Sequence, residues 1–155
     1  MEDPRAHRLD TRCCSGSSPG WLRVRVALRR HRPQAVLCLG LAGSRSAISL
    51  ERVAINLCDA RIADNAGARP AGTPVVAGGP AAHFSRLPVK ALVQRLQAAG
   101  LPAELSLSAG SFVCNQVMYG LLHALRRRPG LLSDTSLLNE SVALVAAYLE
   151  RLRSR

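Results

Sequence analysis

Three short stretches of this chain have the apolar patterns of β-strands. Residues 35–42 (AVLCLGLA) form a continuous apolar run, which is typical of a strand buried on both faces in a parallel sheet. Residues 53–57 predict a second strand, and the alternating residues 104–108 (ELSLS) predict a third. Residues 59–79 are rich in Ala, Gly and Pro, so we expect a long surface loop there.

Helical spacing of apolar residues predicts three helices. The first begins at about Pro88, a residue that suits the first helical position, and ends at Gly100. The second covers residues 113–127 (VCNQVMYGLLHALRR), and the last covers roughly residues 137–152. Strands alternating with helices predict the α/β class, here a three-layer α/β/α domain with a mostly parallel sheet. Ligands of such folds bind at the carboxyl ends of strands, which favours residues 40–51 and 108–115.

The first 32 residues have a different composition. Residues 1–21 mix Pro, Gly, Ser and Arg without apolar periodicity, and residues 21–32 (WLRVRVALRRHR) predict a short helix or strand. We therefore expect residues 1–32 to be a poorly ordered or non-homologous segment, and residues 33–155 to form one domain.

Composition excludes several classes of protein. Apolar residues make up 48% of the 155 residues, so the chain as a whole is not disordered. It has no apolar run of the roughly 20 residues that a membrane-spanning helix needs. Its first residues include Glu2 and Asp3 and lack the apolar segment of a secretory signal. We expect a soluble, cytoplasmic protein that does not bind membranes.

The net charge of +11 raises the question of nucleic-acid binding. All but one of the 21 basic residues are arginine, with clusters at residues 126–128 and 151–155. Both clusters lie where helices are predicted to end, and cations there suit the negative end of the helix dipole. No aromatic stacking platform accompanies them. We expect weak, non-specific polyanion binding and no specific nucleic-acid partner.

The five cysteines are an odd number without a CxxC pair, so we expect neither a disulfide framework nor a zinc site. Cys38 and Cys58 lie in or after apolar runs and are interpreted as small buried hydrophobic residues. Cys114 differs, because it follows a predicted strand and a glycine-containing turn and lies in the first turn of a predicted helix. Unpaired backbone N–H groups there stabilise a thiolate and an oxyanion. The alternative is one more buried residue of an amphipathic helix.

Two segments resemble the signatures of pyroglutamyl peptidase type I, also called pyrrolidone-carboxylate peptidase. Residues 40–56 (GLAGSRSAISLERVAIN) resemble the glutamate signature of this family, and residues 106–115 (SLSAGSFVCN) resemble its cysteine signature. Residues 59–67, 78–92 and 117–123 are also similar to bacterial members. The resemblance runs from about Pro33 to Leu125, so residues 33–155 are identified as a partial domain of this family.

The resemblance implies a cysteine exopeptidase (an omega peptidase) that removes N-terminal pyroglutamate from peptides, without a metal or organic cofactor. Cys114 aligns with the family nucleophile, and Glu51 with the acid that supports the catalytic histidine. Arg61 aligns with an arginine near the scissile carbonyl, and Asp64 is expected to hold its loop. Without the resemblance, Glu51 and Arg61 would be interpreted as ordinary surface residues. By analogy, the protein is expected to form a homo-oligomer.

The family histidine, which follows the nucleophile helix in a GFIHxP-like strand, has no match, so no catalytic histidine is assigned. His123 lies nine residues beyond Cys114 on the same predicted helix, about 13 Å along the axis, too far for a hydrogen bond to the thiolate. We interpret it as a packing or surface residue. His83 occupies a position that is commonly aromatic in the family.

The TGFxPFG-like loop of the family also has no match before Pro33. We expect residues 1–32 to come from a shifted or wrongly started reading frame, or else from a divergent extension.

Three hypotheses about the function follow: a peptidase whose histidine is His83 or comes from a partner chain, an impaired or inactive family remnant of marginal stability, and, less favoured, a basic nucleic-acid-binding protein. We expect impaired activity, since general-base assistance contributes about 10²–10⁴-fold.

Overall fold

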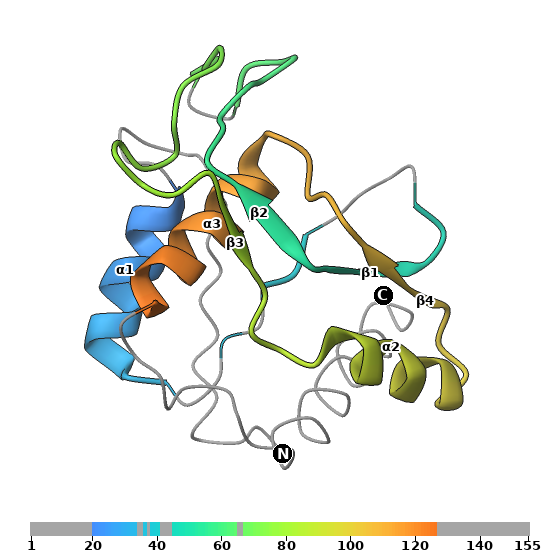
Figure 1. Cartoon of the computed structure of the whole chain (residues 1–155). Helices are drawn as coiled ribbons and strands as arrows, with labels where there is room; N and C mark the ends of the chain where they lie inside the picture. The colour runs from blue at the N-terminus through green and yellow to red at the C-terminus, as the bar shows by residue number, and fades with distance from the viewer. Residues whose placement is uncertain (1–19, 34–35, 37, 41–44, 65–66, 127–155) are drawn as a thin grey trace.

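The computed structural model describes residues 20–33, 36, 38–40, 45–64 and 67–126. Its elements confirm the α/β class predicted from the sequence (Figure 1). In chain order they are α1 (Gly20–His31), β1 (Ile48–Glu51), β2 (Val53–Ile55), β3 (Ala82–Phe84), α2 (Val89–Ala98), β4 (Ala103–Ser106) and α3 (Val113–Leu125). The helix predicted at residues 137–152 lies outside the described residues.

The described strands form two separate pairs. β1 and β4 are parallel, with Glu51 opposite Ser106 at their carboxyl ends. β2 and β3 are antiparallel, with Ala54 opposite His83. The parallel pair agrees with the predicted parallel sheet, but β1 and β3 were not among the predicted strands, because three or four residues are too few to give a periodic pattern.

The helix α2 confirms the prediction for residues 88–100. Val89, Leu92 and Leu96 are buried at helical spacing, and the helix lies beside β4 and β1 in Figure 1. Gly100 has a φ of 76°, a left-handed conformation that most other residues rarely adopt, and the N–H of Leu101 donates to the carbonyl of Leu96. The glycine therefore ends the helix and turns the chain into β4.

The helices α1 and α3 pack side by side (Figure 1). Val24 and Leu28 of α1 are buried against Val117 and Leu125 of α3. These apolar residues lie four or eight positions apart, so each helix presents one apolar stripe to the other. Of the segment 1–32, the structure describes residues 20–32, and α1 within it is packed on the domain rather than separate from it.

The strand predicted at residues 35–42 is not found among its described residues. Val36 and Cys38–Gly40 have no regular secondary structure, and Cys38 and Leu39 are exposed. The interpretation of Cys38 as a buried residue is therefore wrong. A strand buried on both faces needs partner strands beside it, and in the described part of the chain the strands pair as β1 with β4 and β2 with β3.

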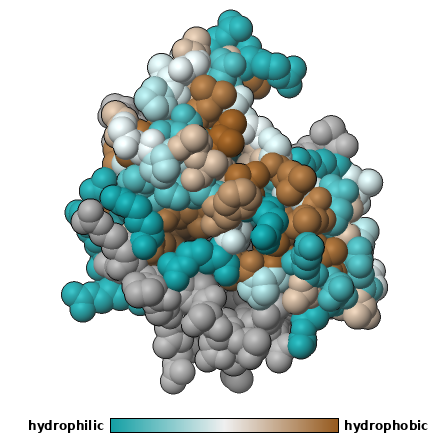
Figure 2. All heavy atoms as spheres, in the orientation of Figure 1, coloured by the Kyte–Doolittle hydropathy of each residue, from teal (hydrophilic) through white to brown (hydrophobic). Residues whose placement is uncertain are grey.

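One face of the molecule carries exposed apolar side chains, which Figure 2 shows as brown areas across its middle. The outward side of the β2–β3 pair bears Ile55 and Phe84, and Phe84 is 65% exposed. Ala54 and His83 point the other way, towards Tyr119 of α3. In the described part of the chain, no helix has the length and apolar character to cross a membrane.

Candidate active site

The carboxyl ends of β1 and β4 bring the two signature segments to one edge of the parallel pair. Glu51 ends β1 opposite Ser106, and the N–H of Arg52 donates to the carbonyl of Ser106 at 2.8 Å. Beyond β4 the chain turns through Gly110, which has a φ of 75°, into α3. Residues 108–115 follow β4 as the sequence predicted, whereas residues 48–51 are themselves a strand and not part of a loop after a strand at residues 35–42.

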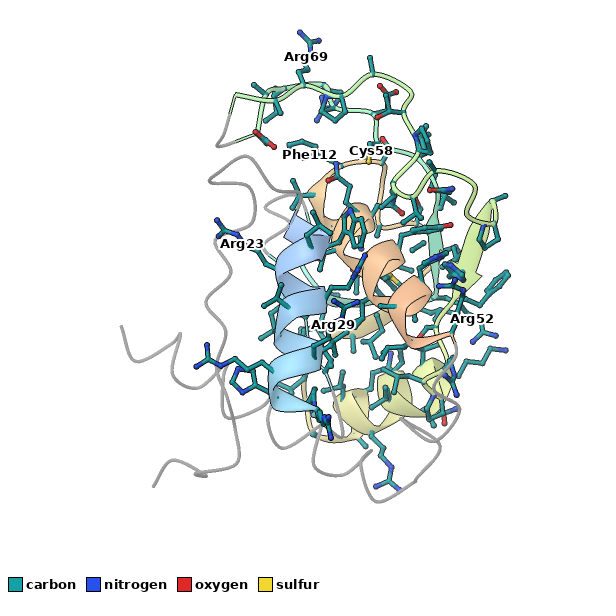
Figure 3. All side chains as sticks on the ribbon, turned by 90° about the vertical axis from the view of Figure 1, so that its left-hand side faces the viewer. Arg23, Arg29, Arg52, Cys58, Arg69 and Phe112 are labelled. Carbon is teal, nitrogen blue, oxygen red and sulfur yellow. The ribbon has the colours of Figure 1, made fainter. Side chains whose placement is uncertain are left out.

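Cys114 is the second residue of α3 and is exposed to solvent. The N-cap residue Phe112, labelled at the amino end of this helix in Figure 3, makes no side-chain hydrogen bond to it, and no acidic residue lies in the first turn. Nothing in that turn therefore neutralises the positive end of the helix dipole, which stabilises a thiolate.

The thiol of Cys114 has a close neighbour in the backbone of Gly40. A Cβ atom added to Gly40 would lie 3.1 Å from Cys114 Sγ, tighter than ordinary contact. Gly40, the first residue of the glutamate signature, therefore lies against the thiol of the candidate nucleophile. Cys58 contrasts with this arrangement: it is buried, as the sequence predicted, and burial raises the pKa of its thiol, which keeps it protonated.

Glu51 is held by an arginine that sequence reasoning did not single out. Arg45 Nη1 lies 2.9 Å from Glu51 Oε1, and Arg45 Nη2 donates to the carbonyl of Ser108 at 3.2 Å. The guanidinium thus links the carboxylate to the turn that leads into α3. Its only sequence signal was its place inside the glutamate signature.

The second carboxylate oxygen, Glu51 Oε2, is buried without a hydrogen-bond partner among the described residues. A buried acceptor left unpaired costs about 1–3 kcal/mol, and more when charged. Such atoms are rare in folded proteins, and each one points to a strained or functional position. Glu51 therefore has one oxygen fixed by Arg45 and one available to a further donor.

Asn115, next to the candidate nucleophile, fixes the start of α3 on β2. Its side chain is 1% exposed, accepts from the N–H of Ile55 and donates to the carbonyls of Ile55 and Leu57, each at 2.9 Å. Sequence reasoning missed this role, and the available signal was a polar residue in an apolar helix. The bonds determine where Cys114 lies relative to β2.

The long loop that carries Arg61 is tied to the turn before α3. The N–H of Asp59 donates to the carbonyl of Ser111 at 2.9 Å, and Ser111 Oγ donates to the carbonyl of Asp59 at 2.8 Å. Arg61 follows two residues later and is exposed. The loop-holding role expected of Asp64 is confirmed, since its Oδ1 accepts from the N–H of Ala68 at 2.9 Å.

His83 and His123 pair with each other around Tyr119. The distance from His83 Nε2 to His123 Nδ1 is 3.1 Å, and the rings of His83 and Tyr119 have centroids 4.7 Å apart. Tyr119 donates from its hydroxyl to the carbonyl of Pro80 at 2.6 Å. His123, interpreted from the sequence as a packing or surface residue, packs against His83 and Tyr119. Among the described residues, no group of three or more His, Cys, Asp or Glu is placed to hold a metal ion.

The stability of the protein is expected to fall on mild acidification because of His83. Burial, and after it the positive charge of Arg126, hold the pKa of His83 below its ordinary value of 6.5. The unfolded chain therefore binds this proton first. The stabilisation that neutral His83 contributes is complete above the pKa that His83 has in the unfolded chain. It is lost as the pH falls from there towards the lower pKa of His83 in the folded protein. Urea midpoints measured between about pH 7.5 and pH 5.5 should decrease.

The matched control is His83→Phe, which keeps an aromatic ring against Tyr119 and removes the titrating group. We expect a flatter dependence of the urea midpoint on pH in this variant. The same decrease in both proteins would show that His83 does not carry the effect.

Comparisons with known proteins identify the family of the chain. The sequence model of a family described as "Pyroglutamyl peptidase" matches residues 22–133. A pyrrolidone-carboxylate peptidase of Gloeobacter violaceus is 62% identical over 102 residues, which are 66% of this chain and 50% of that protein. A pyrrolidone-carboxylate peptidase of Pectobacterium atrosepticum is 61% identical over 102 residues, 47% of its length.

Two solved structures have a similar fold. Pyroglutamyl peptidase I of Bacillus amyloliquefaciens superposes with a TM-score of 0.70 at 42% identity, covering 74% of this chain and 55% of that one. A mutant pyrrolidone carboxyl peptidase of Pyrococcus furiosus gives 0.71 at 39% identity, covering 75% of this chain and 57% of that one. The chain thus spans about half the length of the curated relatives it matches.

Proposed function

Because the chain belongs to the pyroglutamyl peptidase family, as its two signature segments predicted, we propose that it is a cysteine exopeptidase unit for peptides with N-terminal pyroglutamate. The observation that carries the proposal is the exposed thiol of Cys114 in the first turn of α3, at the edge where Glu51 ends β1. We also propose that the protein is cytoplasmic, needs no cofactor and associates with further copies of itself.

The proposed reaction begins at Cys114. Its thiolate attacks the carbonyl carbon of the peptide bond that follows the pyroglutamyl residue. Backbone N–H groups at the amino end of α3 stabilise the oxyanion that forms on this carbonyl. The peptide C–N bond breaks to leave a thioester, and the departing amine takes up a proton. Water then cleaves the thioester, releasing pyroglutamate and restoring the thiol. Arg61, on the loop tied to Ser111, is proposed to polarise the carbonyl.

Glu51 is proposed to orient and charge-stabilise a proton-transfer group through Oε2, the oxygen that Arg45 leaves unpaired. The signature histidine that would take this place is not matched in the chain. In the described part, the nitrogens His83 Nε2 and His123 Nδ1 face each other. We therefore propose that turnover by this chain is about 10²–10⁴-fold below that of a complete centre.

The test combines turnover with thiol labelling in the same protein. We expect slow release of a fluorophore from a pyroglutamyl–fluorophore substrate, and loss of this release in Cys114→Ala. Iodoacetamide at neutral pH should modify Cys114 faster than Cys38, which is also exposed. Cys38→Ala is the matched control and should keep both properties.

The outcomes separate the candidate functions. Selective labelling of Cys114 without turnover would identify an inactive family remnant that keeps the activated thiol. Turnover that survives Cys114→Ala, or labelling that follows Cys38, would overturn the assignment of the nucleophile. A nucleic-acid-binding function would require tight binding that persists at moderate salt, because counterion release alone is lost steeply as salt increases.

A further inference from the structure

A cavity lies between α1 and the carboxyl-terminal half of α3. Its volume is about 360 Å³, and its walls include Trp21, Arg25, Arg29, His123 and Arg126. Gly120, the first α3 residue in its wall, lies six residues beyond Cys114, about 9 Å along the helix axis. The cavity is therefore separate from the thiol site and does not depend on its proposed chemistry.

The charged residues in the described lining of this cavity are all arginines, beside apolar residues such as Leu28 and Val76. Among the residues that the structure describes, three arginines and no carboxylate line it, and the ion pair between Arg45 and Glu51 lies elsewhere. Like charges gathered in a partly enclosed space repel one another and raise the local affinity for anions. The lining therefore favours an anionic ligand.

The helix dipole accounts for the positions of Arg29 and Arg126 but not for that of Arg25. Arg29 lies in the last turn of α1, and Arg126, at the C-cap of α3, donates to the carbonyl of His123 at 2.7 Å, so both suit a helix carboxyl end. Arg25 lies in the middle of α1, with its guanidinium 5.5 Å from the centroid of the Trp21 ring. Stacking on the ring holds this side chain at the cavity wall.

Figure 3 shows the same arrangement from the side of α1. Arg29 projects from α1 towards α3, whereas Arg23 points away from α3 on the opposite side of the helix. The two residues therefore form a matched pair: the same side chain on the same helix, one at the cavity and one outside it.

We propose that this cavity binds a small phosphate-bearing ligand through the guanidinium groups of Arg25, Arg29 and Arg126, with the indole of Trp21 as an apolar wall. Guanidinium groups bind phosphate oxygens through paired, charge-assisted hydrogen bonds, which favours phosphate over a simple halide. The volume is at the lower end of the range for small-molecule sites. Since α1 supplies three of these side chains, ligand binding also depends on the packing of α1 on α3.

The experiment titrates the protein with inorganic pyrophosphate at constant ionic strength near 0.15 M and follows Trp21. Trp21 is the only tryptophan of the chain, so its fluorescence reports this cavity directly. We expect a saturable change, with the apparent Kd raised about tenfold or more in Arg29→Gln and within about twofold of the parent in Arg23→Gln. Calorimetry on the same samples gives a second measure of Kd.

Several outcomes would overturn the proposal: a signal that rises linearly without saturation, equal weakening in Arg29→Gln and Arg23→Gln, or binding confined to long polyanions such as heparin or single-stranded DNA. If Arg29→Gln alters the far-ultraviolet circular dichroism spectrum, Arg126→Gln replaces it and must show the same loss. Cys114→Ala should bind pyrophosphate as the parent does, so failure of the peptidase assignment and failure of this site are told apart.

Discussion

Asn115→Leu is expected to lower the free energy of unfolding by about 3–5 kcal/mol, because each buried backbone group left without its partner costs about 1–3 kcal/mol. Three such groups depend on the Asn115 amide: the N–H and the carbonyl of Ile55, and the carbonyl of Leu57. The Asn115 side chain that makes these bonds is buried, with 1% of its surface exposed. Water cannot replace the lost bonds without opening the contact between α3 and β2. Urea denaturation followed by circular dichroism measures the change.

Gln116→Leu is the matched control for this substitution. It removes the same amide chemistry from the next helical position, where the side chain is half-buried. We expect its unfolding free energy to lie within about 1 kcal/mol of the parent, as is usual away from buried polar networks. If Asn115→Leu were no more destabilising than Gln116→Leu, the amide would not hold α3 on β2, and the placement of Cys114 would need another explanation.

Gly120→Leu is expected to separate α1 from α3. A Cβ atom at this position would press on the Cβ and ring atoms of Trp21, closer than real atoms approach. The Cβ of Trp21 is fixed to the α1 backbone, so the side chain cannot rotate away and the whole helix must move. Overpacking of this kind costs about 1–3 kcal/mol or more, which exceeds the roughly 1 kcal/mol that a helix gains when glycine is replaced. The expected readouts are a lower urea midpoint and a red shift of Trp21 fluorescence.

A double-mutant cycle with Trp21→Gly isolates the contact. Removal of the Trp21 side chain gives the leucine at position 120 room. Gly120→Leu should therefore lower the free energy of unfolding far less in the Trp21→Gly background than in the parent. The coupling energy between the two positions is then large and favourable. Additive effects would mean that α1 does not pack closely on Gly120, and would also remove the structural basis of the cavity beside Trp21.

Much of the fold could be predicted from local pattern. The spacing of Val89, Leu92 and Leu96 with Gly100 after them located α2, because an apolar stripe and a left-handed terminating residue are both local properties. The same holds for α3. The prediction for residues 35–42 was wrong in its described part, since a continuous apolar run does not state whether neighbouring strands exist to cover it.

By itself, the sequence determined the family, the α/β class and the position of Cys114 in the first turn of a helix, since all three depend on residue types at fixed spacing along the chain. Only the tertiary structure decided what surrounds these positions. It brought Arg45 to Glu51 and Ser108, the Asn115 amide to the β2 backbone, and α1 to the face of α3 that carries Gly120. These contacts join residues far apart along the chain, and their energies depend on burial and geometry that local patterns do not encode.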